Sequence, residues 1–253
     1  MHQPLYKFLG GGKPELKILT TVSVKDTAEM VADAKLFVAQ GFETLKIKVG
    51  LNPAEDIQRL KAIRDAVGNS LHILSDANQG WDAKSALQII DSLLTNDLGI
   101  TMVEQPVKAW DYANLKYVRD NSRIPIYADE SVFSLRDASK VINGQMADGI
   151  NIKLMKSGGL YTARPIYDLA TSHNLPCMAG CMLESPIGLA AMAAFVVGKS
   201  NIKFVDLDPI TMIKSNPVIG GVCLDGATLH LSSAPGLGIE RIDNLEAVVT
   251  IGA

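Results

Sequence analysis

The sequence predicts an α/β fold, a TIM-type (β/α)7β barrel that continues into a small C-terminal lobe. Strand-like and helix-like patterns alternate along the chain, and each repeat takes about 25 to 30 residues, which is the spacing of a βα barrel. The strand segments are short and apolar on both faces, as buried parallel strands are. An open doubly wound sheet is the competing fold, but no Gly-x-Gly-x-x-Gly motif follows the first strand.

Each predicted strand except the last is followed by a predicted helix. Asp26 is placed to cap the first long helix, which ends at Gly41, and Asn52 caps the next helix, with Pro53 at its first position. From Thr211 onward the pattern dissolves into turns, so we expect loop over 1–17, barrel over 18–210 and lobe over 211–253. The predicted strands are 18–24, 45–49, 71–77, 101–107, 124–129, 149–155, 176–181 and 203–208.

The bulk composition excludes several classes of protein. The chain has 253 residues, of which 47% are hydrophobic, and a formal charge of −3, and no basic patch stands out in the sequence, which argues against nucleic acid as a partner. Its three cysteines are an odd number, typical of reduced thiols. No signal peptide is visible, and the longest apolar stretch, 186–197, is too short for a membrane span. We expect a cytoplasmic protein with no membrane partner, and assembly into homo-oligomers stays open.

Two lysines alternate with apolar residues in the predicted strand 45–49. Because side chains alternate across a strand, Lys46 and Lys48 share one face and the three apolar residues share the other. Burial and mutual repulsion lower the pKa of such a pair, which makes a lysine a proton acceptor near neutral pH. The alternative is an edge strand whose two lysines lie in water.

Acidic residues end three consecutive predicted strands. Asp76, Glu104 and Asp129 fall at the C-terminal strand ends, where the active sites of βα barrels lie. Converging carboxylates raise one another's pKa, and a hard divalent cation such as Mg²⁺ removes the repulsion. Any one of these acids taken alone is better explained as the cap of the following helix. Three in succession, flanked by lysines, predict a metal site.

Lys153 lies on the sixth predicted strand, across the barrel from Lys48. Two lysines on opposite sides of a metal-bound substrate predict a specific reaction, in which one lysine removes the proton beside a substrate carboxylate. The metal stabilises the enolate, and the other lysine returns a proton to the opposite face. Lys156 is the alternative lysine, but strand parity points it away from the side of Lys153.

Further polar residues follow the same predicted strand ends. Asp206 and Asp208 share one face and can bind a cationic group such as a substrate ammonium, or else cap a helix or pair with a residue of the lobe. Asn78 and Ser131 are placed to position the metal ligands. Glu184 either lines the pocket or caps the next helix.

Taken together, five motifs resemble those of the enolase superfamily, in its muconate-lactonizing-enzyme-like subgroup. The likeness runs over nearly the whole chain. The motifs are Lys46-Ile-Lys48, Asp76-Ala-Asn78, Glu104-Gln-Pro106, Asp129-Glu-Ser131 and Asn151-Ile-Lys153. The resemblance implies an acid/base pair, a neighbouring lysine that depresses the pKa of the first base, and three Mg²⁺ ligands. The acid/base pair would be Lys48 and Lys153, and Lys46 would be the neighbouring lysine. The Mg²⁺ ligands would be Asp76, Glu104 and Asp129.

Within the subgroup, Asp206-Leu-Asp208 looks like the Asp-x-Asp motif that binds the free amino group of the substrate in dipeptide epimerases. The runs 153–159 and 181–185 are also similar to epimerases of the L-Ala-D/L-Glu type. The resemblance implies epimerisation of the C-terminal residue of a dipeptide, with Asn151 and Met182 in substrate binding. Relatives of this kind carry an α+β capping domain that is mostly N-terminal. The segments 1–17 and 211–253 of this chain resemble remnants of that domain. We therefore expect the cap to come from a missing N-terminal region, and weak or absent activity without it.

Three other classes of function are compatible with these residues. A cycloisomerase, an o-succinylbenzoate synthase or an N-acylamino acid racemase uses the same lysines and metal without an ammonium-binding acid pair. A Schiff-base aldolase also places a lysine on a late barrel strand. A non-catalytic barrel that lacks its cap would bind metal and dipeptide without exchanging the α-proton.

Overall fold

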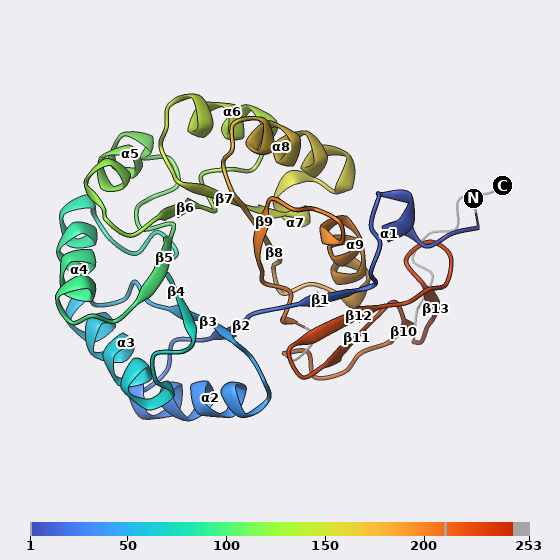
Figure 1. Cartoon of the computed structure of the whole chain (residues 1–253), viewed down its shortest axis with the longest axis horizontal. Helices are drawn as coiled ribbons and strands as arrows, with labels where there is room; N and C mark the ends of the chain where they lie inside the picture. The colour runs from blue at the N-terminus through green and yellow to red at the C-terminus, as the bar shows by residue number, and fades with distance from the viewer. Residues whose placement is uncertain (1, 210–211, 245–253) are drawn as a thin grey trace.

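Eight parallel strands form a curled sheet at the centre of the computed structural model, which describes residues 2–209 and 212–244 (Figure 1). The strands lie side by side in chain order, and a backbone hydrogen bond of 2.8 Å from Leu19 N to Val205 O links the two edges. The predicted barrel fold is confirmed. The strands are β2 (Thr20–Val22), β3 (Thr44–Lys48), β4 (His72–Asp76), β5 (Ile100–Glu104), β6 (Ile126–Ala128), β7 (Gly149–Lys153), β8 (Cys177–Gly180) and β9 (Ile202–Val205).

Helices follow the strands and form an outer layer around the sheet (Figure 1). The predicted caps are confirmed, since the side chain of Asp26 accepts a hydrogen bond from Ala28 N and that of Asn52 from Ala54 N. None of the helices in the described part of the chain is long and apolar enough to cross a membrane. The outer helices are α2 (Thr27–Ala39), α3 (Pro53–Val67), α4 (Ala83–Thr95), α5 (Tyr112–Asn121), α6 (Leu135–Asn143), α8 (Leu160–Ser172) and α9 (Pro186–Val196).

The core has two layers that follow strand parity. Leu45 and Ile47 are fully buried between the sheet and the helices. Lys46 stands in register with Leu74, so both side chains point to the interior of the barrel. The predicted division of strand β3 into two faces is therefore confirmed. Below the lysine, the interior is filled by a smaller apolar cluster of Leu19, Leu74, Met102, Tyr127 and Met178, against which Phe204 packs.

The predicted strand 149–155 is too long at its C-terminal end. β7 ends at Lys153, and a short helix, α7 (Leu154–Ser157), starts at the next residue. Gly158 and Gly159, with φ of 84° and 107°, end this helix and separate it from α8 in a conformation that favours glycine. The side chains after Lys153 therefore no longer alternate as they would on a strand.

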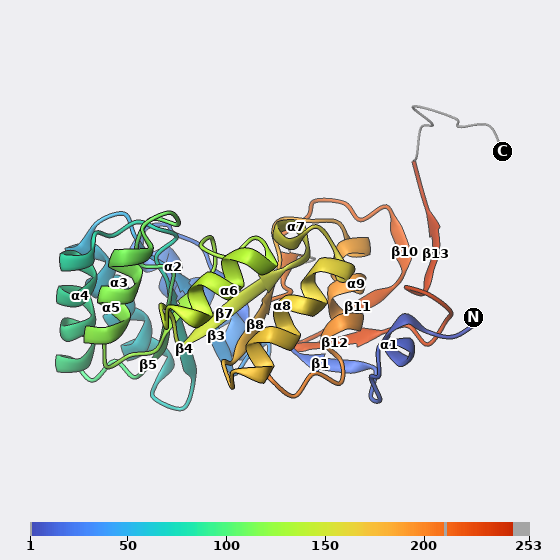
Figure 2. The ribbon, with the colours of Figure 1, turned by 90° about the horizontal axis from the view of Figure 1, so that it is seen from above.

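An N-terminal and a C-terminal segment of the described chain meet in a small lobe beside the barrel (Figure 2). β1 (Glu15–Lys17), β12 (Thr228–Leu231) and β11 (Val222–Asp225) form an antiparallel sheet, and β10 (Val218–Gly220) pairs with β13 (Ile239–Ile242). The short helix α1 (Leu5–Phe8) lies near α9. The segment 1–17 thus contains a helix and a strand where the sequence predicted loop. The predicted boundary at 210/211 and the end of the lobe at 245–253 lie outside the described residues.

Candidate active site

The polar residues predicted at the strand ends gather at the C-terminal end of the barrel. A cavity of about 270 Å³ opens there. Of the predicted site residues, it is lined by both lysines of β3, Lys153, Asn78, Asp129, Met182, Asp206 and Asp208. The last two follow β9, which ends at Val205 and not at Asp208 as predicted. Asp76, Glu104 and Asn151 lie fully buried beneath it. The remaining lining residues are Thr21, Ser23, Glu130, Cys181, Leu183, Pro209 and Met212.

Lys46 lies at the centre of a buried charge cluster. Its side chain is 2% exposed, and its Nζ lies 3.0 Å from Asp76 Oδ2, 2.9 Å from Glu104 Oε2 and 2.9 Å from Asp206 Oδ2. Burial alone would lower the pKa of Lys46, but the carboxylates of Asp206, Asp76 and Glu104 raise it well above its ordinary value. Lys46 is therefore held as a cation that neutralises acids from three strands, and the predicted lowering of the lysine pKa is wrong for Lys46, because the prediction did not include these carboxylates.

The acids around Lys46 differ in how readily they ionise. Burial raises the pKa of Glu104 to about 7, and repulsion from Asp76 adds to the effect. Burial also opposes the ionisation of Asp76, but the ammonium groups of Lys46 and Lys48 outweigh it and lower the pKa of Asp76. Asn151 Nδ2 donates a hydrogen bond of 2.7 Å to Glu104 Oε1. The Glu104 carboxylate thus binds a proton more readily than the Asp76 carboxylate does.

Asp129 joins two lysines on the other side of the barrel. Lys153 Nζ lies 2.6 Å from Asp129 Oδ2, and Lys156 Nζ lies 2.5 Å from Asp129 Oδ1 and 2.9 Å from the carbonyl oxygen of Asn151. Burial opposes the charge of Asp129, but Lys156 and Lys153 lower its pKa. Burial lowers the pKa of Lys156, whereas the pKa of Lys153 is raised because attraction to Asp129 exceeds the effect of its burial.

The prediction that Lys156 points away from the side of Lys153 is wrong. Both lysines contact the same carboxylate. The prediction assumed that the strand continued to residue 155, but α7 begins at Leu154, so strand parity does not apply to Lys156.

Lys48 lies nearer the mouth of the barrel than Lys46. Its side chain is 26% exposed, and its Nζ donates to Asp76 Oδ2 at 2.6 Å and to Asn78 Oδ1 at 2.7 Å. β3 and β7 are four strands apart in an eight-stranded sheet, so Lys48 and Lys153 approach the cavity from opposite walls. This arrangement suits proton transfer on two faces of one carbon.

The acid pair after β9 is buried and tied to β2. Asp208 Oδ2 accepts hydrogen bonds from Thr21 N at 2.6 Å and Thr20 Oγ1 at 3.2 Å. Thr21 Oγ1 donates to Asp206 Oδ1 at 3.4 Å. Burial, and then repulsion from Asp206, raises the pKa of Asp208 to about 6. Two buried carboxyl groups at the cavity wall provide acceptors for a cationic substrate group.

Ser131 lies near the site but does not line the cavity. Gln105 Nε2 donates to Ser131 Oγ at 2.9 Å, and Gln105 Oε1 accepts from Asp129 N at 2.9 Å and Ser131 N at 3.1 Å. Gln105 is fully buried and has a left-handed φ of 36°. Because it directly follows Glu104, its hydrogen bonds connect the end of β5 to the residues around Asp129. This role of Gln105 was not predicted from the sequence, although its position within the Glu104-Gln-Pro106 motif was an available signal.

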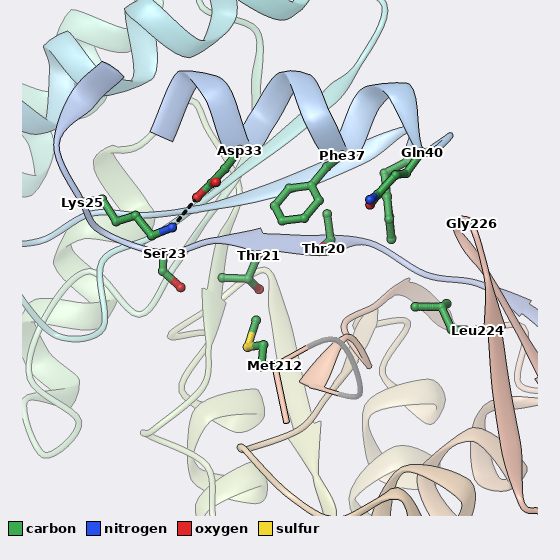
Figure 3. Close-up of a pocket in the computed structure, with 11 residues that line it drawn as sticks. Thr20, Thr21, Ser23, Lys25, Asp33, Phe37, Gln40, Met212, Leu224 and Gly226 are labelled. Atoms are coloured by element: carbon green, nitrogen blue, oxygen red, sulfur yellow. Dashed lines mark hydrogen bonds and ion pairs between the residues drawn. The ribbon is translucent and has the colours of Figure 1, made fainter. Parts of the chain in front are cut away.

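A second cavity, of about 590 Å³, lies outside the barrel between α2, β2 and the lobe (Figure 3). Thr20 and Thr21 form one wall, and Phe37, Met212 and Leu224 contribute apolar surface. The titratable side chains among its described lining residues are Lys25 and Asp33, which pair with each other at 2.7 Å. It is larger than the cavity at the strand ends, but it lacks a cluster of acids and bases, so we assign the chemistry to the strand ends.

The sequence from residue 29 to 244 matches the family described as enolase C-terminal domain-like. The chain belongs to this family. An L-Ala-D/L-Glu epimerase of Clostridium acetobutylicum is 44% identical over 241 residues, which are 95% of this chain and 67% of that protein. The enolase-like barrel also superposes on solved structures. A substrate-liganded L-Ala-D/L-Glu epimerase of Bacillus subtilis matches with a TM-score of 0.93 and 44% identity, covering 95% of this chain and 67% of that one.

A dipeptide epimerase of Enterococcus faecalis, solved with Mg and the dipeptide L-Leu-L-Tyr, matches this enolase-like chain with a TM-score of 0.91 and 41% identity. The match covers 94% of this chain and 68% of that one. The chain thus spans about two thirds of the length of relatives such as these, and 65% of the length of a second curated epimerase, from Bacillus subtilis.

The donor atoms at the strand ends of this enolase-like barrel are of the type that magnesium prefers. Asp76, Glu104 and Asp129 offer only oxygen, and Glu104 Oε2 is buried without an aligned hydrogen bond, although it lies 2.9 Å from Lys46 Nζ. Within residues 2–209 and 212–244, no three His, Cys, Asp or Glu side chains are arranged closely enough to hold a metal ion. The lysines pair with the acids instead, so binding of a divalent cation requires the carboxylates to exchange lysine contacts for the ion.

Proposed function

We propose that this chain is the barrel of a Mg²⁺-dependent dipeptide epimerase of the L-Ala-D/L-Glu type, which inverts the α-carbon of the C-terminal residue. The observation that carries the proposal is the placement of Lys48 and Lys153 on opposite walls of one cavity, four strands apart. Each lysine also contacts an acid that the resemblance assigns to the metal, Asp76 or Asp129.

Asp76, Glu104 and Asp129 would hold the Mg²⁺ ion, which supplies charge stabilisation for an enolate when it is bound. The residues of the chain perform the proton transfers. One of the two lysines accepts the α-proton on one face of the carbon, and the other donates a proton to the opposite face. Lys46 stays protonated, because three carboxylates surround it, and so contributes fixed positive charge.

The dipeptide is the proposed substrate because the acid pair suits a free amino group. Asp206 and Asp208 line the cavity and offer carboxyl oxygens to an ammonium group. N-acylated substrates lack this charge. The names of the relatives support the same choice, since those at 44% and 45% identity are L-Ala-D/L-Glu epimerases.

We further propose that a capping domain covers the mouth of the barrel in the active protein. Large apolar side chains are exposed in the segments that follow five of the barrel strands, and one of them, Leu183, lines the cavity at the strand ends. Exposed apolar surface rimming a pocket is typical of an interaction site. The residues are Leu51, Trp110, Phe133, Met155 and Leu183, of which Trp110 is 75% exposed.

Incubation of the chain with Mg²⁺ and a panel of L,L-dipeptides in D₂O tests the function. We expect deuterium at the C-terminal α-carbon, detected by NMR, at a low rate while the cap is absent, because water then reaches the enolate. Lys153→Met should abolish inversion, and Asp206→Asn with Asp208→Asn should abolish turnover of dipeptides but spare N-acylated amino acids. Retained binding of metal and dipeptide without any exchange would instead identify a non-catalytic barrel. Borohydride trapping of an adduct on Lys153 would identify an aldolase.

A further inference from the structure

Three side chains from three different strand ends form a hydrogen-bonded chain at the mouth of the barrel. Lys48, at the end of β3, donates from Nζ to Asn78 Oδ1 at 2.7 Å. Asn78, after β4, donates from Nδ2 to Glu130 Oε1 at 3.1 Å. Glu130 follows Asp129 at the end of β6 and has no part in the mechanism proposed above. Its second oxygen, Oε2, is buried without a hydrogen-bond partner among the described residues.

The two ends of this chain determine the orientation of the amide between them. An ammonium group can only donate hydrogen bonds, and an ionised carboxylate can only accept them. The Asn78 amide therefore satisfies both neighbours in one orientation, with its oxygen toward Lys48 and its nitrogen toward Glu130. The flipped amide would place its NH₂ against the ammonium and its oxygen against the carboxylate, which are two repulsive contacts.

The backbone holds Asn78 at the place where this contact forms. Asn78 and Gln79 both adopt left-handed φ values, of 42° and 67°, which side-chain-bearing residues rarely combine. Asn78 N donates to Asp76 Oδ1 at 2.9 Å, and Gln79 N donates to the carbonyl oxygen of Gln105 at 2.8 Å. An unfavourable backbone conformation fixed by its neighbours is typical of a functional loop.

We propose that Glu130 is a positioning residue for Lys48, acting through the Asn78 amide. The proposal rests on the proposed function for its catalytic meaning, but the contacts exist independently of it. Lys153, on the opposite wall, donates directly to the Asp129 carboxylate at 2.6 Å. The loss of Glu130 therefore disturbs one of the two bases and leaves the other in place.

The direct test measures hydrogen exchange of the lysine ammonium groups by NMR in the ¹⁵N-lysine-labelled chain, with Lys48→Arg and Lys153→Arg used to assign the two signals. Glu130→Leu should speed exchange of the Lys48 ammonium by about tenfold, the expected effect of weakening one hydrogen bond to a charged group. The Lys153 signal should not change. Glu130→Gln keeps an acceptor oxygen and should restore most of the protection. Glu184→Leu removes a carboxylate that accepts from the backbone N of Met182, a cavity residue, at 3.3 Å. It is the matched control and should leave Lys48 unaffected. An unchanged Lys48 rate in Glu130→Leu would overturn the proposal.

The second test uses the two faces of the reaction. Exchange of the α-proton with D₂O is followed separately from each epimer of a dipeptide, and Lys48→Met identifies the epimer that depends on Lys48. Glu130→Leu should slow exchange from that epimer by about tenfold and spare the other. An equal loss from both epimers would indicate a general structural role and refute the positioning role. If neither epimer exchanges with the unmodified chain while the NMR result holds, the proposed function fails and the positioning role stands.

Discussion

Replacement of Lys46 by methionine tests whether this ammonium neutralises the acids of the barrel interior. Its Nζ lies within 3.0 Å of Asp76, Glu104 and Asp206, and its side chain is 2% exposed. Methionine is of similar length and fills the space without charge. The three carboxyl groups would lose their shared cation in a site that water does not reach from below, because the apolar cluster around Leu74 fills the interior there.

Removal of one partner from a buried ion pair costs about 3–5 kcal/mol. The entropy of unfolding is about 2.1 cal/mol/K per residue, so a chain of this length has an unfolding entropy of about 0.5 kcal/mol/K near Tm. Lys46→Met should therefore lower Tm by about 6–9 °C. Mg²⁺ should recover more of this loss in the variant than it adds to the unmodified chain, because the ion supplies the missing charge to the same acids.

Thermal unfolding followed by circular dichroism, with EDTA or with Mg²⁺, measures both effects. Lys61→Met is the matched control, because Lys61 pairs with Asp65 at 3.6 Å and both side chains are more than half exposed. A surface pair of this kind contributes at most about 1 kcal/mol, so this Tm should change by about 2 °C or less. A Tm for Lys46→Met that matches this control would refute the assignment of Lys46 as the neutralising cation.

Two further predictions concern the stability of the fold. Asp208, whose pKa is raised to about 6 by burial and by Asp206, stabilises the fold at low pH, and this contribution is lost as the pH rises from about 4 through 6. The unfolding free energy of Asp208→Asn relative to the unmodified chain should therefore increase between pH 4 and pH 7 in urea titrations, and a difference that stays constant would contradict the assignment. Arg64 donates to the carbonyl oxygens of Leu98, Gly68, Leu71 and Gly99, so Arg64→Met should cost about 2–4 kcal/mol in the same assay without altering Mg²⁺ affinity. A change in Mg²⁺ affinity would contradict this prediction, because it would show that the Arg64 hydrogen bonds, which lie far from the C-terminal strand ends, affect the metal site.

Strand parity and chain order made most of the site predictable. Lys46 lies inside the barrel because side chains alternate along β3, and Asp76 and Glu104 meet it because consecutive parallel strands end at the same edge. These rules depend on local sequence and on the fold class alone. They place both lysines of β3 on the correct face without any knowledge of side-chain contacts.

Contacts that depend on loop geometry were not predictable in this way. Lys156 was placed on the wrong side because the end of β7 and the start of α7 differ from the predicted strand by two residues. The contact between Asn78 and Glu130 joins residues 52 positions apart and depends on two left-handed residues after β4. Sequence patterns constrain neither the exact end of a strand nor the backbone of the loop after it.

The barrel interior has an apolar layer and a charged layer along its axis, and this order explains why the candidate catalytic residues lie at the mouth. An apolar cluster that includes Leu74 and Tyr127 closes the barrel below Lys46, and the charged residues occupy the level above it. Buried charges are tolerated there because each ammonium meets a carboxylate at hydrogen-bonding distance. Exposure increases upward, from 2% for the side chain of Lys46 to 26% for that of Lys48. A substrate that enters from the mouth therefore meets Lys48 first, and the fixed cation Lys46 lies behind it.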